Sequence, residues 1–345
     1  MDVFEVLKRL TRAAGVSGGE NSAASVASDF LKEYANAVGF DCHGSVTGFI
    51  GNRNNGRPVI LLDAHIDEIG LIVTHIDKEG FVKAEPCGGV DRRSLSALTV
   101  TVHGKEPVKG VICSSPPHAG NKNEEAALKA GEIRIDTGYG REGLEKIISP
   151  GDKITADGEL TRLLGGKVSG RALDNRAGVT AVLYALSLLK NGSPGFNIAV
   201  AFTVQEELGC RGGRVAAYNA DADYAIVTDV SYGISPAISP NEEHKCGKPG
   251  GGPMLGFAPS LDREMFDGLR KTAEDWEIPY QLEIMNRDTG GTNADEISLA
   301  KGGVKTALVS VPLRYMHTPV ETVALSDVEA AGQLIAAYIE GFNSV

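Results

Sequence analysis

Two histidines and several carboxylates of this 345-residue chain stand beside the apolar segments that we expect to form buried strands. His65 follows the apolar run at residues 59–62, and Glu206 follows the run at residues 197–204. The full set of candidates is His65, Asp67, Asp174, Glu206, Glu207, Asp229 and His317. Because ligands of an open α/β sheet collect at the carboxyl ends of its strands, we expect these side chains to meet at one edge of the sheet.

The adjacent pair Glu206 and Glu207 is more informative than any single acid of the set. Two carboxylates beside a buried strand are costly to keep charged unless a cation lies nearby or one of them is protonated. A lone Asp, such as Asp174 or Asp229 taken by itself, is more often a turn or helix-cap residue than a ligand. The conjunction of two histidines with several acids at one sheet edge is what favours a metal site.

The residue types also indicate which metals would bind. Imidazole nitrogens and carboxylate oxygens without a thiolate suit zinc, cobalt or manganese better than calcium. Three acidic ligands and two histidines suggest two divalent ions that share one carboxylate and lie about 3.5–4 Å apart. Such a pair activates a water and polarises a carbonyl for hydrolysis, while a spare Glu moves the proton. Asp67, two residues after His65, has the spacing of a carboxylate that orients a ligating imidazole.

Helices and apolar strands that alternate along the chain must position these side chains. Apolar residues at helical spacing predict helices at residues 3–14, 22–38, 177–189, 211–218 and 263–275, near residue 295, and from the S-x-x-E capping box at residues 326–329. Core strands are predicted at residues 59–62, 197–204, 224–228, 280–284 and 305–311. This alternation indicates an α/β fold with a mainly parallel, twisted sheet flanked by helices.

A β-rich segment interrupts the alternation. Between residues 71 and 164, short strand candidates are separated by turns rich in Gly, Pro and Asp. We therefore predict an α/β domain formed by residues 1–70 and 165–345, with a small, mainly β domain inserted at residues 71–164. The length agrees with two domains, since a domain commonly has about 150 residues.

Composition and charge exclude several classes of function. The chain has 34 Lys and Arg against 45 Asp and Glu, and this net charge of −11 is unfavourable for binding a nucleic-acid backbone. Five scattered cysteines form no CxxC pair, so neither a disulfide framework nor a cysteine zinc site is expected. No apolar run reaches the ~20 residues of a membrane span, and Asp2 and Glu5 stand where a signal peptide has positive charge. We expect a cytoplasmic protein with neither nucleic-acid nor membrane partners.

Four short motifs carry a resemblance to a known enzyme family. They are HIDEIG at residues 65–70, ALDNR at 172–176, QEELG at 205–209 and RYMHTP at 314–319. Over nearly its whole length the chain resembles the tetrahedral aminopeptidases, also known as glutamyl or deblocking aminopeptidases and cellulase M, a family of dinuclear metallopeptidases. The resemblance implies a fold like that of the co-catalytic zinc exopeptidases and a metal-dependent aminopeptidase activity.

The resemblance further implies two divalent metal ions per subunit, with zinc favoured over cobalt and manganese. The ligands that it implies are His65, Asp174 and Asp229 for one ion and Asp174, Glu207 and His317 for the other. Glu206 would be the general base toward a water between the metals, and Asp67 would hold His65. The inserted domain would mediate dimerisation, and the dimers would assemble into a hollow dodecamer.

The function that we expect is hydrolysis of the N-terminal residue of short peptides that have a free amino terminus. Two other classes stay open: a metal-dependent deacylase or other hydrolase on the same scaffold, and a non-catalytic, metal-stabilised oligomeric peptide-binding protein. Asn293 departs from the family pattern, which usually has Asp there, and this removes a charge close to the expected substrate region. Thr318 stands where Ser is common and keeps the hydroxyl.

Overall fold

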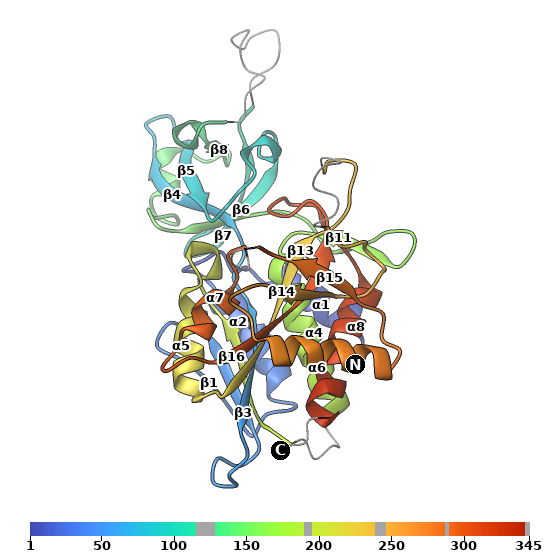
Figure 1. Ribbon diagram of the computed structural model, residues 1–345. Coiled ribbons are helices and arrows are strands. Elements are labelled where there is room, and N and C mark those ends of the chain that lie inside the picture. Colours follow the sequence, from blue (N-terminus) through green and yellow to red (C-terminus); the bar gives the residue numbers. More distant parts are fainter. Residues whose placement is uncertain (115–127, 190–194, 239–245, 287–289, 342–345) are drawn as a thin grey trace.

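The protein consists of an α/β unit with a β-barrel unit attached to one end of it (Figure 1). The computed structural model describes residues 1–114, 128–189, 195–238, 246–286 and 290–341. A mainly parallel sheet flanked by helices and interrupted by a β-rich insertion was expected from the sequence. The strand topology confirms this fold class.

Within the described residues, an eight-stranded sheet forms the centre of the α/β unit in the order β1-β2-β12-β3-β13-β16-β14-β15. Its strands are β1 (Ala37–Phe40), β2 (Val46–Ile50), β3 (Val59–His65), β12 (Asn197–Thr203), β13 (Tyr224–Tyr232), β14 (Met254–Phe257), β15 (Gln281–Ile284) and β16 (Lys305–Leu313). The central strands β12, β3, β13 and β16 are parallel, and β2 and β14 flank them in antiparallel orientation. Every residue of β3 and β12 is buried, because helices cover both faces of the sheet.

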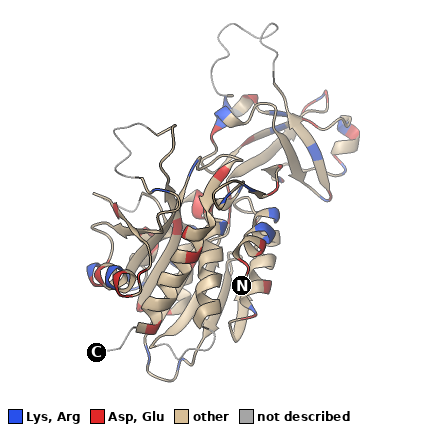
Figure 2. Cartoon of the chain, turned by 90° about the vertical axis from the view of Figure 1, so that its right-hand side faces the viewer, with Lys and Arg blue, Asp and Glu red and all other residues tan. Residues whose placement is uncertain are grey.

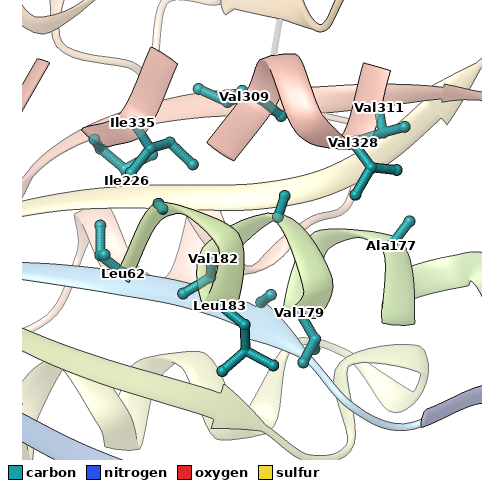
Figure 3. Close-up of a cluster of buried hydrophobic side chains, with 14 of the residues drawn as sticks. Leu62, Ala177, Val179, Val182, Leu183, Ile226, Val309, Val311, Val328 and Ile335 are labelled. Carbon is teal, nitrogen blue, oxygen red and sulfur yellow. The ribbon is translucent and has the colours of Figure 1, made fainter. Parts of the chain in front are cut away.

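The helices pack in two layers around this sheet. They are α1 (Val3–Arg12), α2 (Asn21–Leu31), α4 (Leu173–Leu189), α5 (Arg211–Ala220), α6 (Arg263–Asp275), α7 (Asn293–Ser298) and α8 (Leu325–Gly341). On one face, Leu62 and Ile226 of the sheet meet Val182 of α4 and Ile335 of α8 (Figure 3). On the other face, α5 and α7 bury a smaller, alanine-rich cluster against the same strands.

The second unit is a closed barrel with the strand order β4-β5-β8-β7-β6-β9. Its elements are β4 (Gly70–Ile76), β5 (Val82–Cys87), β6 (Thr99–His103), β7 (Pro107–Ile112), β8 (Arg134–Asp136), α3 (Arg141–Leu144) and β9 (Lys153–Ala156). Its inward-facing side chains, among them Leu71, Val100 and Ile135, form a hydrophobic core of their own. A separate small sheet consists of β10 (Thr161–Arg162), β11 (Lys167–Gly170) and β17 (Glu321–Ala324). The boundaries predicted for the inserted domain, residues 71–164, stay a prediction.

Several helices differ from their sequence-based bounds, and in two of them a neighbouring strand lies at the changed end. The helix predicted at residues 22–38 ends at Leu31, because residues 37–40 pair with β2 as an edge strand instead. The helix predicted to be capped by Ser326 begins one residue earlier, at Leu325, directly after β17. Local helix propensity identified both helices, and the strand beside each one limits where it begins or ends.

Charged residues are distributed over both units (Figure 2). Acidic segments also lie in the region where the α/β unit meets the barrel (Figure 2). In the part of the chain that the structure describes, no helix is both long and apolar enough to span a membrane.

Candidate metal centre

The strands that carry two of the candidate residues are longer than predicted. β3 runs through His65 and β13 runs through Tyr232, so His65 and Asp229 lie within strands rather than after them. The residues of β3 alternate between the two core clusters, which places His65 on the sheet face that α5 and α7 cover. Glu206 begins a short 3-10 helix that is separated from the end of β12 by two residues. Because β3, β12 and β13 are adjacent and parallel, all three side chains meet at one edge of the sheet.

The segments that carry Asp174 and His317 approach the same edge from outside the sheet. Asp174 lies at the start of α4 with non-helical backbone angles, φ −77° and ψ 105°. His317 lies between β16 and β17 with a φ of +62°, in the left-handed region that non-glycine residues rarely adopt. Neither side chain is therefore presented by a regular helix or strand.

The two histidines face different oxygens of Asp174. His65 Nε2 lies 3.1 Å from Asp174 Oδ1, and His317 Nε2 lies 3.5 Å from Asp174 Oδ2. Asp229 Oδ1 is 3.5 Å from His65 Nε2, and Glu207 Oε1 is 3.4 Å from His317 Nε2. Asp174 thus stands between two groups of atoms that could bind a metal, with one of its oxygens directed at each group.

Three overlapping groups of side chains bring ligand-type atoms within 4.8 Å of one another. Among the described residues these groups are His65, Asp174 and Asp229; Asp174, Glu207 and His317; and His65, Glu206 and Glu207. The first two groups contain the residues that the family resemblance implied for the two ions, and the third adds Glu206. The structure therefore brings the predicted ligands together, while their binding of metal stays a prediction.

The hydrogen bonding of His317 directs a nitrogen lone pair at carboxylate oxygens. His317 Nδ1 lies 2.9 Å from the carbonyl oxygen of Gly89, which can only accept, so Nδ1 carries the proton. Nε2 then presents its lone pair toward Asp174 and Glu207, an arrangement that suits a cation between them. Without a cation, hydrogen bonds to these carboxylates raise the pKa of His317 to about 11, and a proton takes the same position.

Glu206 has unfavourable surroundings for a negative charge. Only 8% of its surface is exposed, and its Oε2 lies 3.9 Å from His65 Nε2. Burial raises the pKa of Glu206 to about 8, and the neighbouring carboxylates add to this increase against the opposing effect of His65. A buried group of acids with two imidazoles fits a divalent cation, and zinc, cobalt and manganese accept this combination of donors.

Asp67 anchors the turn that carries the acidic pair. Its Oδ1 accepts from the Glu206 N–H at 3.0 Å, and its Oδ2 accepts from the Glu207 N–H at 3.2 Å and from Ser17 Oγ at 2.6 Å. Its Oδ1 also lies 3.4 Å from His65 Nδ1. Burial alone would raise the pKa of Asp67, but the interaction with His65 and the hydrogen bonds lower it overall. The residue predicted to hold His65 is therefore placed to hold the acidic turn as well.

Glu321 belongs to the site but was not among the residues predicted from the sequence. It is 1% exposed, and its Oε1 accepts from the His317 N–H at 2.9 Å while its Oε2 accepts from the Asp174 N–H at 3.1 Å. Burial raises its pKa well above the usual range, and the two N–H groups oppose that increase. The signal in the sequence is an acid four residues after His317, which by itself is indistinguishable from an exposed turn residue.

Asn293, which departs from the family pattern, is buried, with 1% of its surface exposed. Its position relative to a substrate stays a prediction. Its Nδ2 donates to Asp63 Oδ2 and to Thr203 Oγ1, both at 2.8 Å. Asp63 precedes His65 by two residues on the same face of β3, and burial raises its pKa to about 7. An Asp at position 293 would place a second carboxylate against Asp63, so the amide avoids a contact between like charges.

Comparison with known proteins matches these features to one family. A family model described as M42 glutamyl aminopeptidase matches residues 44–334. The lysyl aminopeptidase of Pyrococcus furiosus is 32% identical over 344 residues, which cover 98% of this chain and 96% of that protein. The solved aminopeptidase APDkam598 from the archaeon Desulfurococcus kamchatkensis has a TM-score of 0.91 and 32% identity, with 99% of this chain and 95% of that chain covered.

A second solved structure, the Pyrococcus horikoshii TET1 peptidase, has a TM-score of 0.87 and 30% identity, with 99% of this chain and 100% of that chain covered. That peptidase can assemble into a tetrahedron or a large octahedral shell. The family match spans both the strand that ends in His65 and the loop that carries His317. The chain therefore belongs to the M42 glutamyl aminopeptidase family and is a metallo-aminopeptidase, a hydrolase.

Proposed function

We propose that this enzyme removes the N-terminal residue of short peptides that have a free amino terminus, with two divalent metal ions bound per subunit. The ligands would be His65, Asp174 and Asp229 for one ion and Asp174, Glu207 and His317 for the other. The observation that carries the proposal is the position of Asp174, whose two oxygens face different histidines. Zinc is favoured by this donor set, and cobalt and manganese have overlapping ligand preferences.

Glu206 is the residue that we assign to proton transfer. Divalent ions in the site would lower the pKa of a water molecule and polarise the scissile carbonyl. The buried Glu206 carboxylate has a raised pKa, which suits a group that takes a proton from water and then delivers it to the leaving amine. Asp67 accepts its backbone N–H, which holds the turn that places the Glu206 carboxylate 3.9 Å from His65 Nε2.

The proposed ions support a preference for a free amino terminus. The side chains of Asp174, Glu206, Glu207 and Asp229 are concentrated in one cluster, and two divalent ions bound there would offset their negative charge. A free α-amine has a nitrogen lone pair that could bind one of these ions, whereas the lone pair of an acylated nitrogen is delocalised into its carbonyl group. An N-terminal amine would thereby fix which peptide bond lies at the site, and cleavage would release one residue at a time.

We further propose that the barrel domain, residues 71–164, mediates dimerisation and that the dimers assemble into a dodecamer. Support comes from PhTET1-12s, which was solved as a dodecamer and resembles this chain with a TM-score of 0.87 at 30% identity. Size-exclusion chromatography with light scattering measures the mass in solution. A mass of one subunit at the concentration used for activity assays would contradict this part of the proposal.

Amino-acid p-nitroanilides, with and without an N-acetyl group, test the proposed activity. We expect cleavage of the free-amine substrates alone, loss of activity after chelation, and recovery on addition of zinc, cobalt or manganese. Release of acetate from the acetylated substrates would instead support a deacylase. Bound metal without any cleavage would support a peptide-binding protein.

Glu206→Gln tests the assignment of the base. We expect the variant to keep its metal content and to lose at least about 10²–10⁴-fold in turnover, the usual contribution of general acid–base catalysis. Asp327→Asn is a matched control, because Asp327 is a buried carboxylate that binds the N–H groups of Gly250 and Gly252. The control should retain turnover close to that of the wild type. A Glu206→Gln enzyme of wild-type activity would show that another group transfers the proton.

A further inference from the structure

One carboxylate connects two ligand-type residues that are far apart in the sequence. Asp174 lies at the start of α4, and His317 lies in the loop before β17. Glu321 accepts the backbone N–H of each of them, with one oxygen for His317 at 2.9 Å and the other for Asp174 at 3.1 Å. Because only 1% of Glu321 is exposed, bulk water is not in a position to replace either bond.

Strand pairing explains why Glu321 lies between these two segments. In β17, Glu321 pairs with Gly170, the last residue of β11. The next residue, Thr322, exchanges two backbone hydrogen bonds with Arg314, at 2.9 and 3.0 Å. These pairings hold Glu321 between two segments, the one that follows β11 and the one that follows β16.

Both segments contain backbone conformations that need support from their surroundings. Ala172 has a φ of +58° and His317 has a φ of +62°. Residues with a Cβ adopt this left-handed region rarely, and they keep it only where neighbouring contacts determine it. The N–H of His317 itself is one of the two groups that Glu321 binds, so the carboxylate supplies such a contact.

We propose that Glu321 is a positioning residue that sets the separation of Asp174 and His317 and thereby controls binding of the ion between them. The inference rests on the proposed function, in which Asp174, Glu207 and His317 hold one of the two ions. Glu321 accepts backbone N–H groups from two residues of that set, Asp174 and His317. In the set that includes His65, it binds the backbone of Asp174 alone. Removal of the Glu321 carboxylate therefore weakens the ion at His317 more than the ion at His65.

Glu321→Gln removes the charge and half of the accepting capacity without changing the size of the side chain. The amide oxygen can accept one N–H, and the NH2 group opposes the other. Asp327→Asn is again the matched control, because it makes the same chemical change to a buried carboxylate that accepts two N–H groups, from Gly250 at 2.7 Å and Gly252 at 2.9 Å. The two variants differ in the segments that the carboxylate holds. Glu321 binds the N–H groups of two proposed metal ligands, whereas Asp327 binds those of the Gly250 loop.

Metal content is the measurement. Each protein is dialysed against zinc and the bound zinc per subunit is counted by mass spectrometry, while cobalt titration followed by visible absorption separates the two ions. We expect two ions in the wild type and in Asp327→Asn, and in Glu321→Gln one tightly bound ion and a second whose affinity is about 10–100-fold lower. Two ions of wild-type affinity, with an unchanged cobalt spectrum, in Glu321→Gln would overturn the inference.

Glu321→Asp provides a second test in case Glu321→Gln folds poorly. It keeps the negative charge, but its carboxylate is one methylene shorter and cannot reach both N–H groups. A folded Glu321→Asp protein with one tight ion supports the inference, whereas two tight ions, or failure of both variants to fold, overturns it. A wild-type protein that binds fewer than two ions overturns the proposed function and this inference with it. Two ions in the wild type and in the Glu321 variants alike overturn the inference alone.

Discussion

Replacement of Asp67 with Asn tests whether one carboxylate organises the acidic turn and the His65 imidazole. The side chain keeps its shape, but an NH2 group takes the place of one accepting oxygen. In one orientation this NH2 group faces the N–H of Glu206, and in the other it faces the N–H of Glu207. A buried backbone donor therefore loses its acceptor whichever way the amide turns.

The size of the effect follows from these contacts. A hydrogen bond to a charged group contributes about 1.5–3 kcal/mol, and Asp67 loses at least one of those it accepts from Ser17, Glu206 and Glu207. The bonds that persist become weaker, since a neutral acceptor forms bonds about half as strong as those of a carboxylate. We expect the free energy of unfolding of the metal-free protein to fall by about 3 kcal/mol. Metal affinity should fall by about 10–100-fold, because the carboxylate beside His65 Nδ1 becomes an amide and no longer orients the imidazole in the same way.

Urea unfolding of the metal-free protein, followed by circular dichroism, and calorimetric zinc titration measure the two effects separately. Ser17→Ala is the control, because it removes one hydroxyl donor and leaves the Asp67 carboxylate in place. The control should cost about 1 kcal/mol and leave metal affinity unchanged. An Asp67→Asn protein with the unfolding free energy and zinc affinity of the wild type would refute the role assigned to Asp67.

Three other outcomes are expected from the structure. Gly178→Ala should destabilise the protein by about 1–3 kcal/mol, because the new Cβ would lie 2.7 Å from the carbonyl oxygen of Thr228. In thermal melts Gly341→Ala, which has open space around it, should show no such loss. With a thiol reagent and peptide mass spectrometry, exposed Cys42 should be labelled in the native protein. Cys210 should be labelled only on unfolding, because burial and then the Glu206 carboxylate raise the pKa of its thiol. Asp157→Asn should cost about 1 kcal/mol at pH 7 and less at an acidic pH below the unfolded pKa of this residue. Burial raises the pKa of Asp157, but hydrogen bonds from Lys109 and Thr101 lower it overall, so its stabilisation is present above the unfolded pKa and is lost as the pH falls through the folded one. Urea unfolding at both pH values checks this difference, and an equal loss at both would contradict it.

The residues that the central strands bring to the sheet edge could be predicted because each one lies in or near a segment whose apolar run indicates a buried strand. The run at residues 59–62 is apolar throughout, so it could be interpreted as a buried strand, and His65 follows it in the sequence. Adjacent parallel strands end at a common edge of the sheet. Glu206 and Asp229 could therefore be placed near His65 without knowledge of any contact between them. What the strand pattern could not predict was where each strand ends, and β3 includes His65 itself.

The supporting contacts could not be predicted, because they join residues with no local relation. Glu321 binds a backbone N–H that is 147 positions away, and Asn293 binds Asp63 across 230 positions. Asp327 lies in a segment with the pattern of a capping box, yet its carboxylate binds the Gly250 loop instead. In each case a buried polar group takes the partner that the completed fold brings near, since leaving it unpaired is costly.

Two metal ions that share Asp174 are central to the mechanism proposed for this enzyme. A crystal of the zinc-loaded protein, with diffraction data collected on both sides of the zinc absorption edge, locates the ions directly. We expect two anomalous peaks per subunit, both in contact with Asp174, with one also bound by His65 and the other by His317. A single peak, or peaks that do not contact Asp174, would contradict the proposed centre.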